Sequence, residues 1–533
     1  MPVITRFHAD LALLPGTATP TRGVGPTDPT VAYPLAAPDP VAAASAAAAE
    51  SGIAPQVLAD VLIETTDGRF TAITPGVPIG VAAADGAIRL RGLTIPGLAN
   101  AHSHAFHRAL RGRTHAGKGS FWTWRDAMYA LAERLDPDNY YYLARAVFAE
   151  MALAGITAVG EFHYLHHGPD GARYDDPNAM GQAMIYAARD AGIRITLLDT
   201  LYLTAEVNAS AMSAAAMSAA VVGPHAVGGA PLNATQRRFS DGDVAAWATR
   251  VSTLVAQPHA RIGVAAHSVR AVPASVLPQI AAVAGGRPLH VHLSEQRAEN
   301  SACLAQHGRT PTQLLADCGL LGPTTTAVHA THLTDDDRTC LGDSDTAVCF
   351  CPTTERDLAD GIGPARALVD AGSPLCLGSD SHAIIDMFAE ARAVEMHERL
   401  RTEMRGHFSA GELTAAASVN GHRALGWHDA GEIAVGMRAD LVTLRMDSPR
   451  TAGTDPIATP VFAASAADVT NVVVDGRIIV RKGAHTTIDV GPDLASAIAA
   501  VTGTAAPTVT APTVTAPAVT ARAAVPADPA VAP

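Results

Sequence analysis

Short apolar runs alternate with longer amphipathic stretches between residues 96 and 428. The clearest amphipathic stretch begins at Asp136-Pro137, a helix-start signal, and ends at Gly155. This alternation predicts strands joined by helical crossovers, and eight such units close into a (β/α)8 barrel of the α/β class. The expected barrel strands are 97–102, 157–162, 193–200, 262–266, 288–293, 325–330, 346–351 and 374–378.

The two ends of the chain carry a different pattern, in which short strands follow one another without long helices. We expect residues 1–95 and 429–490 to form the two parts of a small β-sandwich, with the barrel of residues 96–428 between them in sequence. The expected strands of this second unit are 4–15, 61–64, 69–73, 432–435, 439–444, 469–474 and 477–480.

Two segments fit neither pattern. Residues 16–57 are rich in Pro, Ala, Gly and Thr, which predicts a low-complexity insertion. Residues 503–533 repeat Ala-Pro-Thr-Val-Thr and lack the apolar periodicity of a core, so we expect a disordered tail.

Composition narrows the class of protein. The chain has 533 residues, of which 48% are hydrophobic and 17% charged, and this balance is typical of a soluble globular protein. The formal charge of −13 argues against nucleic acid or an anionic membrane as a partner and favours a small-molecule substrate. No signal peptide or long apolar run is evident, so we expect a cytoplasmic protein. The six cysteines contain no C-x-x-C pair and are expected to be free thiols.

The strongest chemical signal lies where the first barrel strand ends. His102 and His104 are two residues apart, so both side chains share one face and can bind one metal ion. Later strands end in His292, His329 and Asp380, and the C-terminal strand ends of a barrel meet at one mouth. Imidazoles with a carboxylate suit zinc with a coordination position left for water.

Other interpretations of these residues stay open at this point. His329 could be a core histidine, with His332 as a rival, and Asp380 could cap the following helix. Glu295 lies three residues after His292, where it could act on a metal-associated water or simply pair with Arg297 at the surface.

The residues near the expected mouth also carry alternatives. Arg270 offers a fork-shaped guanidinium that suits bidentate recognition of a carboxylate, or it is a surface arginine. Trp122, Trp124 and Tyr164 either line the pocket or pack the first two loops after the strands.

Six segments together resemble the formimidoylglutamate deiminases of the amidohydrolase superfamily, over most of residues 58–490. The Phe-Trp-Thr-Trp, Glu-Phe-His-Tyr and His-Ser-x-Arg elements are far more specific to this family than the His-x-His and Ser-Asp elements. The segments are residues 99–106, 120–125, 161–167, 267–273, 351–355 and 378–382.

The resemblance implies one zinc ion bound by His102, His104, His292 and Asp380. It also implies that Glu295 and His329 are catalytic, with Asp380 accepting a proton from water, and that the substrate is bound by other residues at the mouth. These expected substrate-binding residues are His107, Trp122, Tyr164, Arg237, His267 and Arg270. The implied reaction is hydrolytic deimination of N-formimidoyl-L-glutamate to N-formyl-L-glutamate and ammonia, in histidine degradation.

The chain departs from the family pattern at two places. His107 stands where the family usually has glutamine, and residues 205–226 add an alanine- and methionine-rich stretch. Binuclear members of the superfamily commonly use a carboxylated lysine at a strand end. Only Lys118 and Lys482 are present, and neither lies in an expected barrel strand, which favours one metal ion.

Two other functions remain as alternatives. One is another mononuclear zinc aminohydrolase, of the guanine, cytosine or S-adenosylhomocysteine deaminase type, and the other is an inactive metal-binding homologue. Arg270 and the stretch around Arg237 favour the dicarboxylate substrate over the first alternative. We also expect a homodimer, although no motif in the chain carries that expectation.

Overall fold

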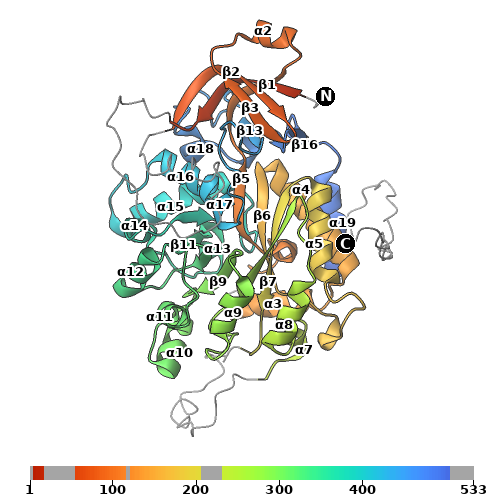
Figure 1. Ribbon diagram of the computed structural model, residues 1–533, viewed down its shortest axis with the longest axis vertical. Coiled ribbons are helices and arrows are strands. Elements are labelled where there is room, and N and C mark those ends of the chain that lie inside the picture. The colour runs from red at the N-terminus through yellow and green to blue at the C-terminus, as the bar shows by residue number, and fades with distance from the viewer. Residues whose placement is uncertain (1–3, 17–54, 116–120, 206–230, 505–533) are drawn as a thin grey trace, which may run out of the picture.

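The computed structural model describes residues 4–16, 55–115, 121–205 and 231–504. Eight parallel strands lie side by side in chain order, and a bridge between Ser103 and Asp380 connects the last to the first. The (β/α)8 barrel and all eight of its expected strands are therefore confirmed (Figure 1). The strands are β5 (Leu98–Ser103), β6 (Ile156–His163), β7 (Arg194–Leu201), β8 (Ala260–Ala266), β9 (Leu289–Leu293), β10 (Thr325–His329), β11 (Ala347–Phe350) and β12 (Leu375–Leu377).

The barrel strands are covered on both faces, which is why they appear in the sequence as continuous apolar runs. Every residue of β6 and β7 is buried. The packing around β6 is so close that a Cβ at Gly160 would lie 2.4 Å from Leu425 and 2.6 Å from the carbonyl oxygen of Ala101. Only glycine fits at that position.

Helices surround the barrel, and the expected helix after Asp136 is confirmed. The Asp136 carboxylate accepts the backbone N–H of Asn139, Pro137 opens the first turn, and the chain leaves the helix before Gly155 with φ of 88°. The helices are α3 (Phe121–Ala132), α4 (Pro137–Leu153), α5 (Ala179–Ala191), α7 (Ala234–Arg237), α8 (Val244–Ser252), α9 (Leu277–Ala284), α10 (Arg297–His307), α11 (Pro311–Asp317), α12 (Asp335–Asp343), α13 (Pro352–Asp357), α14 (Ala365–Asp370), α15 (Met387–Thr402), α16 (Ala410–Ala417), α17 (Val419–Ala424), α18 (Thr459–Phe462) and α19 (Val490–Thr502).

The chain ends form a second, mixed sheet, as the sequence predicts. Its order is β16-β15-β14-β13-β4-β1-β2-β3, so strands from the N-terminal part pair directly with strands from the C-terminal part at β4 and β13. The sheet encloses its own apolar core, which includes Phe7, Ile63, Phe70, Leu441 and Val473. The strands are β1 (Ile4–Leu14), β2 (Gln56–Thr66), β3 (Arg69–Thr74), β4 (Ile88–Pro96), β13 (Leu441–Leu444), β14 (Val469–Val474), β15 (Arg477–Arg481) and β16 (Ala484–His485), with α2 (Ile79–Ala84) before β4.

One expected strand is wrong. Residues 432–435 form a loop and a turn between Gly431 and Gly436, which have φ of 94° and 90°. Ile433 is buried in the small core, so its apolar character reflects packing and not a strand. A backbone hydrogen bond fixes the loop against β3, because Phe70 donates its N–H to the carbonyl oxygen of Met437.

Some of the predictions concern residues that the structure does not describe. Most of the insertion 16–57, most of residues 205–226, and residues 505–533 of the tail lie outside the described residues. Lys118 does so too, and Lys482 lies in a turn after β15. In the part of the chain that the structure describes, no helix is both long and apolar enough to cross a membrane.

Candidate active site

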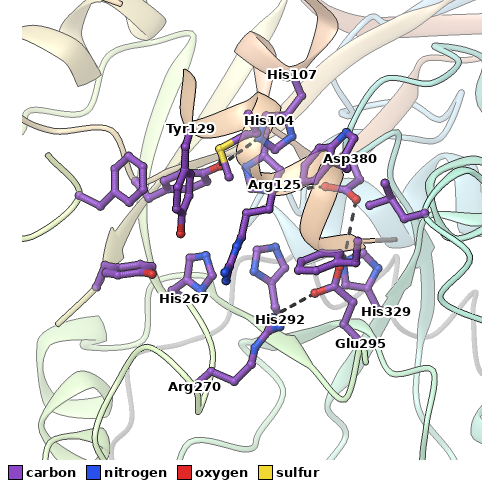
Figure 2. Close-up of a pocket in the computed structure, with 17 residues that line it drawn as sticks. His104, His107, Arg125, Tyr129, His267, Arg270, His292, Glu295, His329 and Asp380 are labelled. Carbon is purple, nitrogen blue, oxygen red and sulfur yellow. Dashed lines mark hydrogen bonds and ion pairs between the residues drawn. The ribbon is translucent and has the colours of Figure 1, made fainter. Parts of the chain in front are cut away.

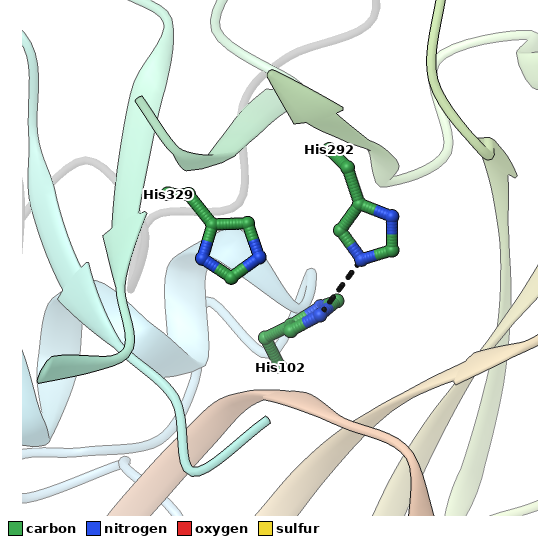
Figure 3. A group of neighbouring side chains, drawn as sticks. All are labelled: His102, His292 and His329. Atoms are coloured by element: carbon green, nitrogen blue, oxygen red, sulfur yellow. Dashed lines mark hydrogen bonds between the residues drawn. The ribbon is translucent and has the colours of Figure 1, made fainter. Parts of the chain in front are cut away.

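Three histidines and an aspartate from distant parts of the chain meet at one end of the barrel. The Nε2 atoms of His102 and His104 each lie 3.3 Å from Oδ1 of Asp380. His292 Nε2 is 3.1 Å from His102 Nε2, and the two rings are nearly perpendicular (Figure 3). The convergence predicted from the strand ends is therefore present.

The protonation states of these side chains suit the binding of a metal ion. Burial lowers the pKa of His102 to about 4 and that of His104 to about 3, and it lowers the pKa of His292 well below its usual value. His104 Nδ1 lies 3.0 Å from the carbonyl oxygen of Phe162, so Nδ1 carries the proton and Nε2 presents its lone pair. Neutral imidazole nitrogens and a carboxylate this close together are a donor set that fits zinc.

His329 differs from the other histidines of the cluster. Although burial lowers its pKa, the charge of Glu295, a hydrogen bond to Glu355 and the charge of Asp380 together raise that pKa to about 10. Its Nδ1 lies 3.5 Å from Glu355 and its Nε2 lies 3.9 Å from Glu295 and 4.0 Å from Asp380. His329 also lies close enough to His102 and His292 to share a metal ion with them, and its contacts with Glu295, Glu355 and Asp380 place it equally to interact with reacting groups.

At the strand ends the backbone adopts left-handed conformations that residues other than glycine rarely take. Ser294, His329 and Asp380 have φ of 52°, 70° and 41°. Asp380 is held there because its N–H donates to the carbonyl oxygen of His102 and its own carbonyl oxygen accepts from His104. Such conformations cost about 1–3 kcal/mol each and concentrate at functional sites.

A pocket opens beside this cluster and contains most of the expected substrate-binding residues. His107, Tyr164, His267 and Arg270 line it, together with the histidines and carboxylates of the cluster. His107 Nε2 lies 2.9 Å from the hydroxyl of Tyr164, and Arg270 donates to Glu295 across 3.1 Å. Glu295 is therefore paired with Arg270, and the alternative pairing with Arg297 is not observed.

Some pocket residues were not singled out from the sequence. Arg125 is 8% exposed and extends into the centre of the pocket between His267 and His292 (Figure 2). Arg125 is the last residue of the sequence Phe-Trp-Thr-Trp-Arg, so this motif could have indicated it as a pocket residue. Other lining residues without an assigned role are Phe121, Met128, Tyr129, Tyr202, Phe239 and Leu358.

Two expected substrate contacts are corrected by the structure. Arg237 is not among the pocket residues, because its guanidinium is 45% exposed and pairs with Asp170. Trp122 is likewise not part of the lining and packs its ring against Arg125, whose guanidinium carbon lies 4.3 Å from the ring centre. Trp122 therefore contacts a pocket residue without lining the pocket itself.

A second group of potential metal-binding atoms is formed by His163, His166 and Asp199. Arg250 already donates to both carboxylate oxygens of Asp199, across 2.7 and 2.8 Å. A guanidinium in that position supplies the positive charge that the carboxylate requires, so we assign no metal to this group.

The fold and the site define a class of protein: a (β/α)8 barrel with a histidine–aspartate cluster at its mouth that could hold a metal ion. The chain belongs to the amidohydrolase family, whose model matches residues 93–479.

Two relatives indicate the range of related activities. The chain is 36% identical to formimidoylglutamate deiminase of Pseudomonas aeruginosa, over 79% of this chain and 91% of that protein. It is 29% identical to a 5-methylthioadenosine/S-adenosylhomocysteine deaminase of Haloarcula marismortui, over 79% of this chain and 89% of that protein.

Solved structures share the fold. An amidohydrolase from Brucella melitensis has a TM-score of 0.76 and 27% identity, over 93% of this chain and all of that one. An adenosine deaminase from Xanthomonas campestris, solved with bound zinc, has a TM-score of 0.69 and 21% identity, over 92% and 96% of the two chains. At that identity the second comparison supports the fold alone.

Proposed function

We propose that this amidohydrolase deiminates N-formimidoyl-L-glutamate to N-formyl-L-glutamate and ammonia. The observation that carries the proposal is a pocket with two guanidinium groups, those of Arg125 and Arg270, next to the histidine–aspartate cluster. A substrate with two carboxylates matches two guanidinium groups. The relative from Pseudomonas aeruginosa, a formimidoylglutamate deiminase, supports the same choice.

One zinc ion bound by His102, His104, His292 and Asp380 is part of the proposal. All four side chains are buried, and their donor atoms face one another as described above. When bound there, zinc supplies Lewis acidity that makes water nucleophilic near neutral pH. Only two lysines occur in the chain, and the described barrel strands contain no lysine, which agrees with one ion.

Asp380 and Glu295 transfer protons in the proposed reaction, and His329 stabilises charge. Although burial raises the pKa of Asp380, hydrogen bonding to His102 and the charge of His329 hold it far below its usual range, so Asp380 is ionised. We assign to this carboxylate the proton of the attacking water. The water oxygen bonds to the formimidoyl carbon. The proton that Asp380 takes from the water passes to the Glu295 carboxylate, which delivers it to the departing nitrogen, so that the C–N bond breaks and ammonia leaves. The His329 cation stabilises negative charge near the reacting carbon.

The remaining pocket residues bind the glutamate part of the substrate. We assign one carboxylate to Arg270 and the other to Arg125, with His267, Tyr164 and His107 forming the wall between the guanidinium groups and the cluster. Burial lowers the pKa of His107 well below its usual value, so a neutral imidazole takes the place of the usual glutamine. Like that amide, it can donate or accept a hydrogen bond.

A nucleoside deaminase is the second candidate, because a relative at 29% identity has that activity. 5-Methylthioadenosine carries no carboxylate and S-adenosylhomocysteine carries one, so neither matches two guanidinium groups as a dicarboxylate does. A screen for ammonia release from formimidoylglutamate, S-adenosylhomocysteine, guanine and cytosine separates these possibilities, and no release from any of them would indicate an inactive homologue.

Replacing Arg270 tests the substrate assignment. Arg270→Ala should lower kcat/KM for N-formimidoyl-L-glutamate at least about thirtyfold, because a bidentate charge-assisted pair is lost. Arg270→Lys should recover only part of the loss, because a point charge cannot reproduce the guanidinium fork. Steady-state ammonia release measures both effects.

The comparison substrate is a formimidoyl alkylamine without carboxylates. Because Arg270 also contacts Glu295, Arg270→Ala should lower kcat/KM for both substrates to some extent. The additional decrease in kcat/KM for N-formimidoyl-L-glutamate measures the contact between Arg270 and the carboxylate. Arg237→Ala is the matched control and should change neither substrate, since that arginine is not in the pocket. Equal losses would mean that Arg270 only positions Glu295, and no loss with either would refute the substrate assignment.

A further inference from the structure

Glu161, a buried carboxylate on β6, holds the strand end that carries His104. One of its oxygens lies 2.7 Å from the hydroxyl oxygen of Ser103, and the other lies 2.7 Å from the backbone nitrogen of Ala105. These two donors flank His104 on both sides. Phe162, the next residue along β6, provides its carbonyl oxygen to Nδ1 of His104 across 3.0 Å. The two consecutive residues of β6 therefore fix both the backbone and the ring of this proposed metal ligand.

Ser103 also connects this strand end to the segment that carries Asp380. Its Oγ lies 3.1 Å from Nε2 of His382, and Nδ1 of His382 lies 2.9 Å from Oγ of Ser379. Ser379 contacts Asn100 on β5 twice, because its N–H lies 2.9 Å from Oδ1 and its Oγ lies 2.7 Å from Nδ2. The five side chains are fully buried, and we call them the Glu161 network: Asn100, Ser379, His382, Ser103 and Glu161.

The hydrogens of the Glu161 network can be assigned from the end at Asn100. The N–H of Ser379 needs an acceptor, so Oδ1 of Asn100 faces it, and the NH2 group of Asn100 donates to Ser379 Oγ. Among the described residues, Nδ1 of His382 is the acceptor left for the Ser379 hydroxyl, so the ring proton of His382 is on Nε2 and donates to Ser103. The hydroxyl of Ser103 then donates to Glu161. Every hydrogen of the network points toward this carboxylate, which can only accept.

The environment of Glu161 agrees with that role. Burial raises its pKa to about 8, while the hydrogen bonds that it accepts from Ser103, Ala105 and Tyr140 act in the opposite direction and favour the carboxylate. Glu161 does not line the pocket and is not part of the histidine–aspartate cluster. It can therefore act on the site only through the residues that it holds.

We propose that Glu161 is a positioning residue that fixes His104 directly, and Asp380 through the rest of the Glu161 network, in the arrangement that binds the metal ion. The inference rests on the metal site of the proposed function and extends it to a residue that is not a ligand. It requires that Glu161 affects metal binding and turnover and leaves KM almost unchanged.

Glu161→Gln is the most direct test, because glutamine has the same shape but one acceptor oxygen and one NH2 group. It cannot accept from both Ser103 and Ala105, so one donor is left facing another donor. The Kd for zinc, measured on the holoenzyme by competition with a chromogenic chelator, should rise about 10- to 100-fold, and kcat should fall by a similar factor. KM should stay within about threefold of the wild-type value. Assays at about pH 9 lie above the pKa of Glu161, so that the wild-type side chain is ionised.

Glu390 provides a matched control for the loss of a buried carboxylate. It is also fully buried, burial raises its pKa to about 8 as well, and it accepts hydrogen bonds from the N–H and the hydroxyl of Thr353. Neither residue lines the pocket. Glu390→Gln should therefore lower Tm about as much as Glu161→Gln does, while the Kd for zinc and kcat stay at the wild-type values.

Ser103→Ala tests the connection to Asp380 separately, and it gives a result even if Glu161→Gln does not fold. It removes the hydroxyl between Glu161 and His382 but retains the bond from Ala105, so the Kd for zinc should rise at least about threefold. The absorption spectrum of the cobalt(II)-substituted enzyme reports the geometry of the ligands. It should change in this variant and in Glu161→Gln, and it should be unchanged in Glu390→Gln.

Two results would overturn the positioning role of Glu161. One is a wild-type Kd for zinc together with an unchanged cobalt spectrum, either in Ser103→Ala or in folded Glu161→Gln. The other is an equal weakening of zinc binding in Glu390→Gln, which would trace the effect to a general loss of stability. A wild-type enzyme that binds no zinc after reconstitution gives a different result, because it would refute the proposed metal site and the positioning role with it.

Discussion

Replacing His292 with alanine is expected to reduce bound zinc well below one ion per chain and to lower kcat/KM by about three orders of magnitude or more. His292 contributes one of three neutral imidazoles, and its Nε2 lies 3.1 Å from that of His102. Without it, two histidines and Asp380 remain, and a site that has lost one of its four proposed ligands should bind zinc more weakly. Metal analysis after dialysis, together with ammonia release, measures both effects.

His290 provides the control on the same strand. It is two residues earlier on β9, faces the same side and is fully buried, but its Nε2 lies 3.1 Å from the carbonyl oxygen of Ala424 and not in the cluster. His290→Gln can keep that hydrogen bond and should retain zinc and most of the activity. Full zinc occupancy in His292→Ala would remove His292 from the metal site and leave His329 as the candidate in its place.

The barrel and its cluster could be predicted because they follow from strong physical rules. Strands covered on both faces appear as apolar runs, and the runs end where polar side chains reach the mouth. His102 and Asp380 are far apart in sequence, yet closure of the barrel places their strands together, as the bridge between Ser103 and Asp380 shows. Convergence of the candidate ligands needed only the number and order of the strands.

The pocket wall was harder to predict because helices supply much of it. Arg125 and Tyr129 come from α3, and which face of a helix points inward depends on packing that the sequence does not specify. Gln236 and Arg237 are adjacent, but consecutive helical side chains point about 100° apart. One therefore contacts the pocket tyrosines and the other pairs with Asp170 at the surface.

The contact between Glu355 and His329 could not be predicted from the sequence either. The sequence placed Glu355 in a motif that resembles the family, but gave no reason to connect it with His329. The two side chains meet because the end of β10 lies beside the start of α13, which follows the neighbouring strand β11. A contact between groups after adjacent strands depends on the course of each loop, and spacing along the chain does not provide it.

Glu295→Gln should lower kcat by about two to four orders of magnitude, because the amide cannot deliver a proton to the departing nitrogen. The fold and the metal should be unaffected. Glu295 is not within the proposed ligand set, and a glutamine can still accept the hydrogen bond that Arg270 donates across 3.1 Å. Zinc content and Tm should therefore match the wild type while ammonia release falls.

Glu299→Gln is the corresponding control. Glu299 is also buried and also lies near Arg270, at 3.9 Å, but it contacts the backbone N–H of Glu295 and does not line the pocket. Its substitution should cost less than about tenfold, since no proton passes through it.

The nature of the leaving group separates proton delivery by Glu295 from a purely electrostatic effect. An N-hydroxyformimidoyl analogue of the substrate releases hydroxylamine, a weaker base than ammonia, which needs less protonation as it departs. If Glu295 supplies the proton, Glu295→Gln should lose less activity on this analogue than on formimidoylglutamate. Equal losses on both would assign Glu295 to stabilising the charge of His329, whose raised pKa depends partly on that carboxylate. Near-normal turnover of formimidoylglutamate by a zinc-loaded variant would exclude Glu295 from catalysis altogether.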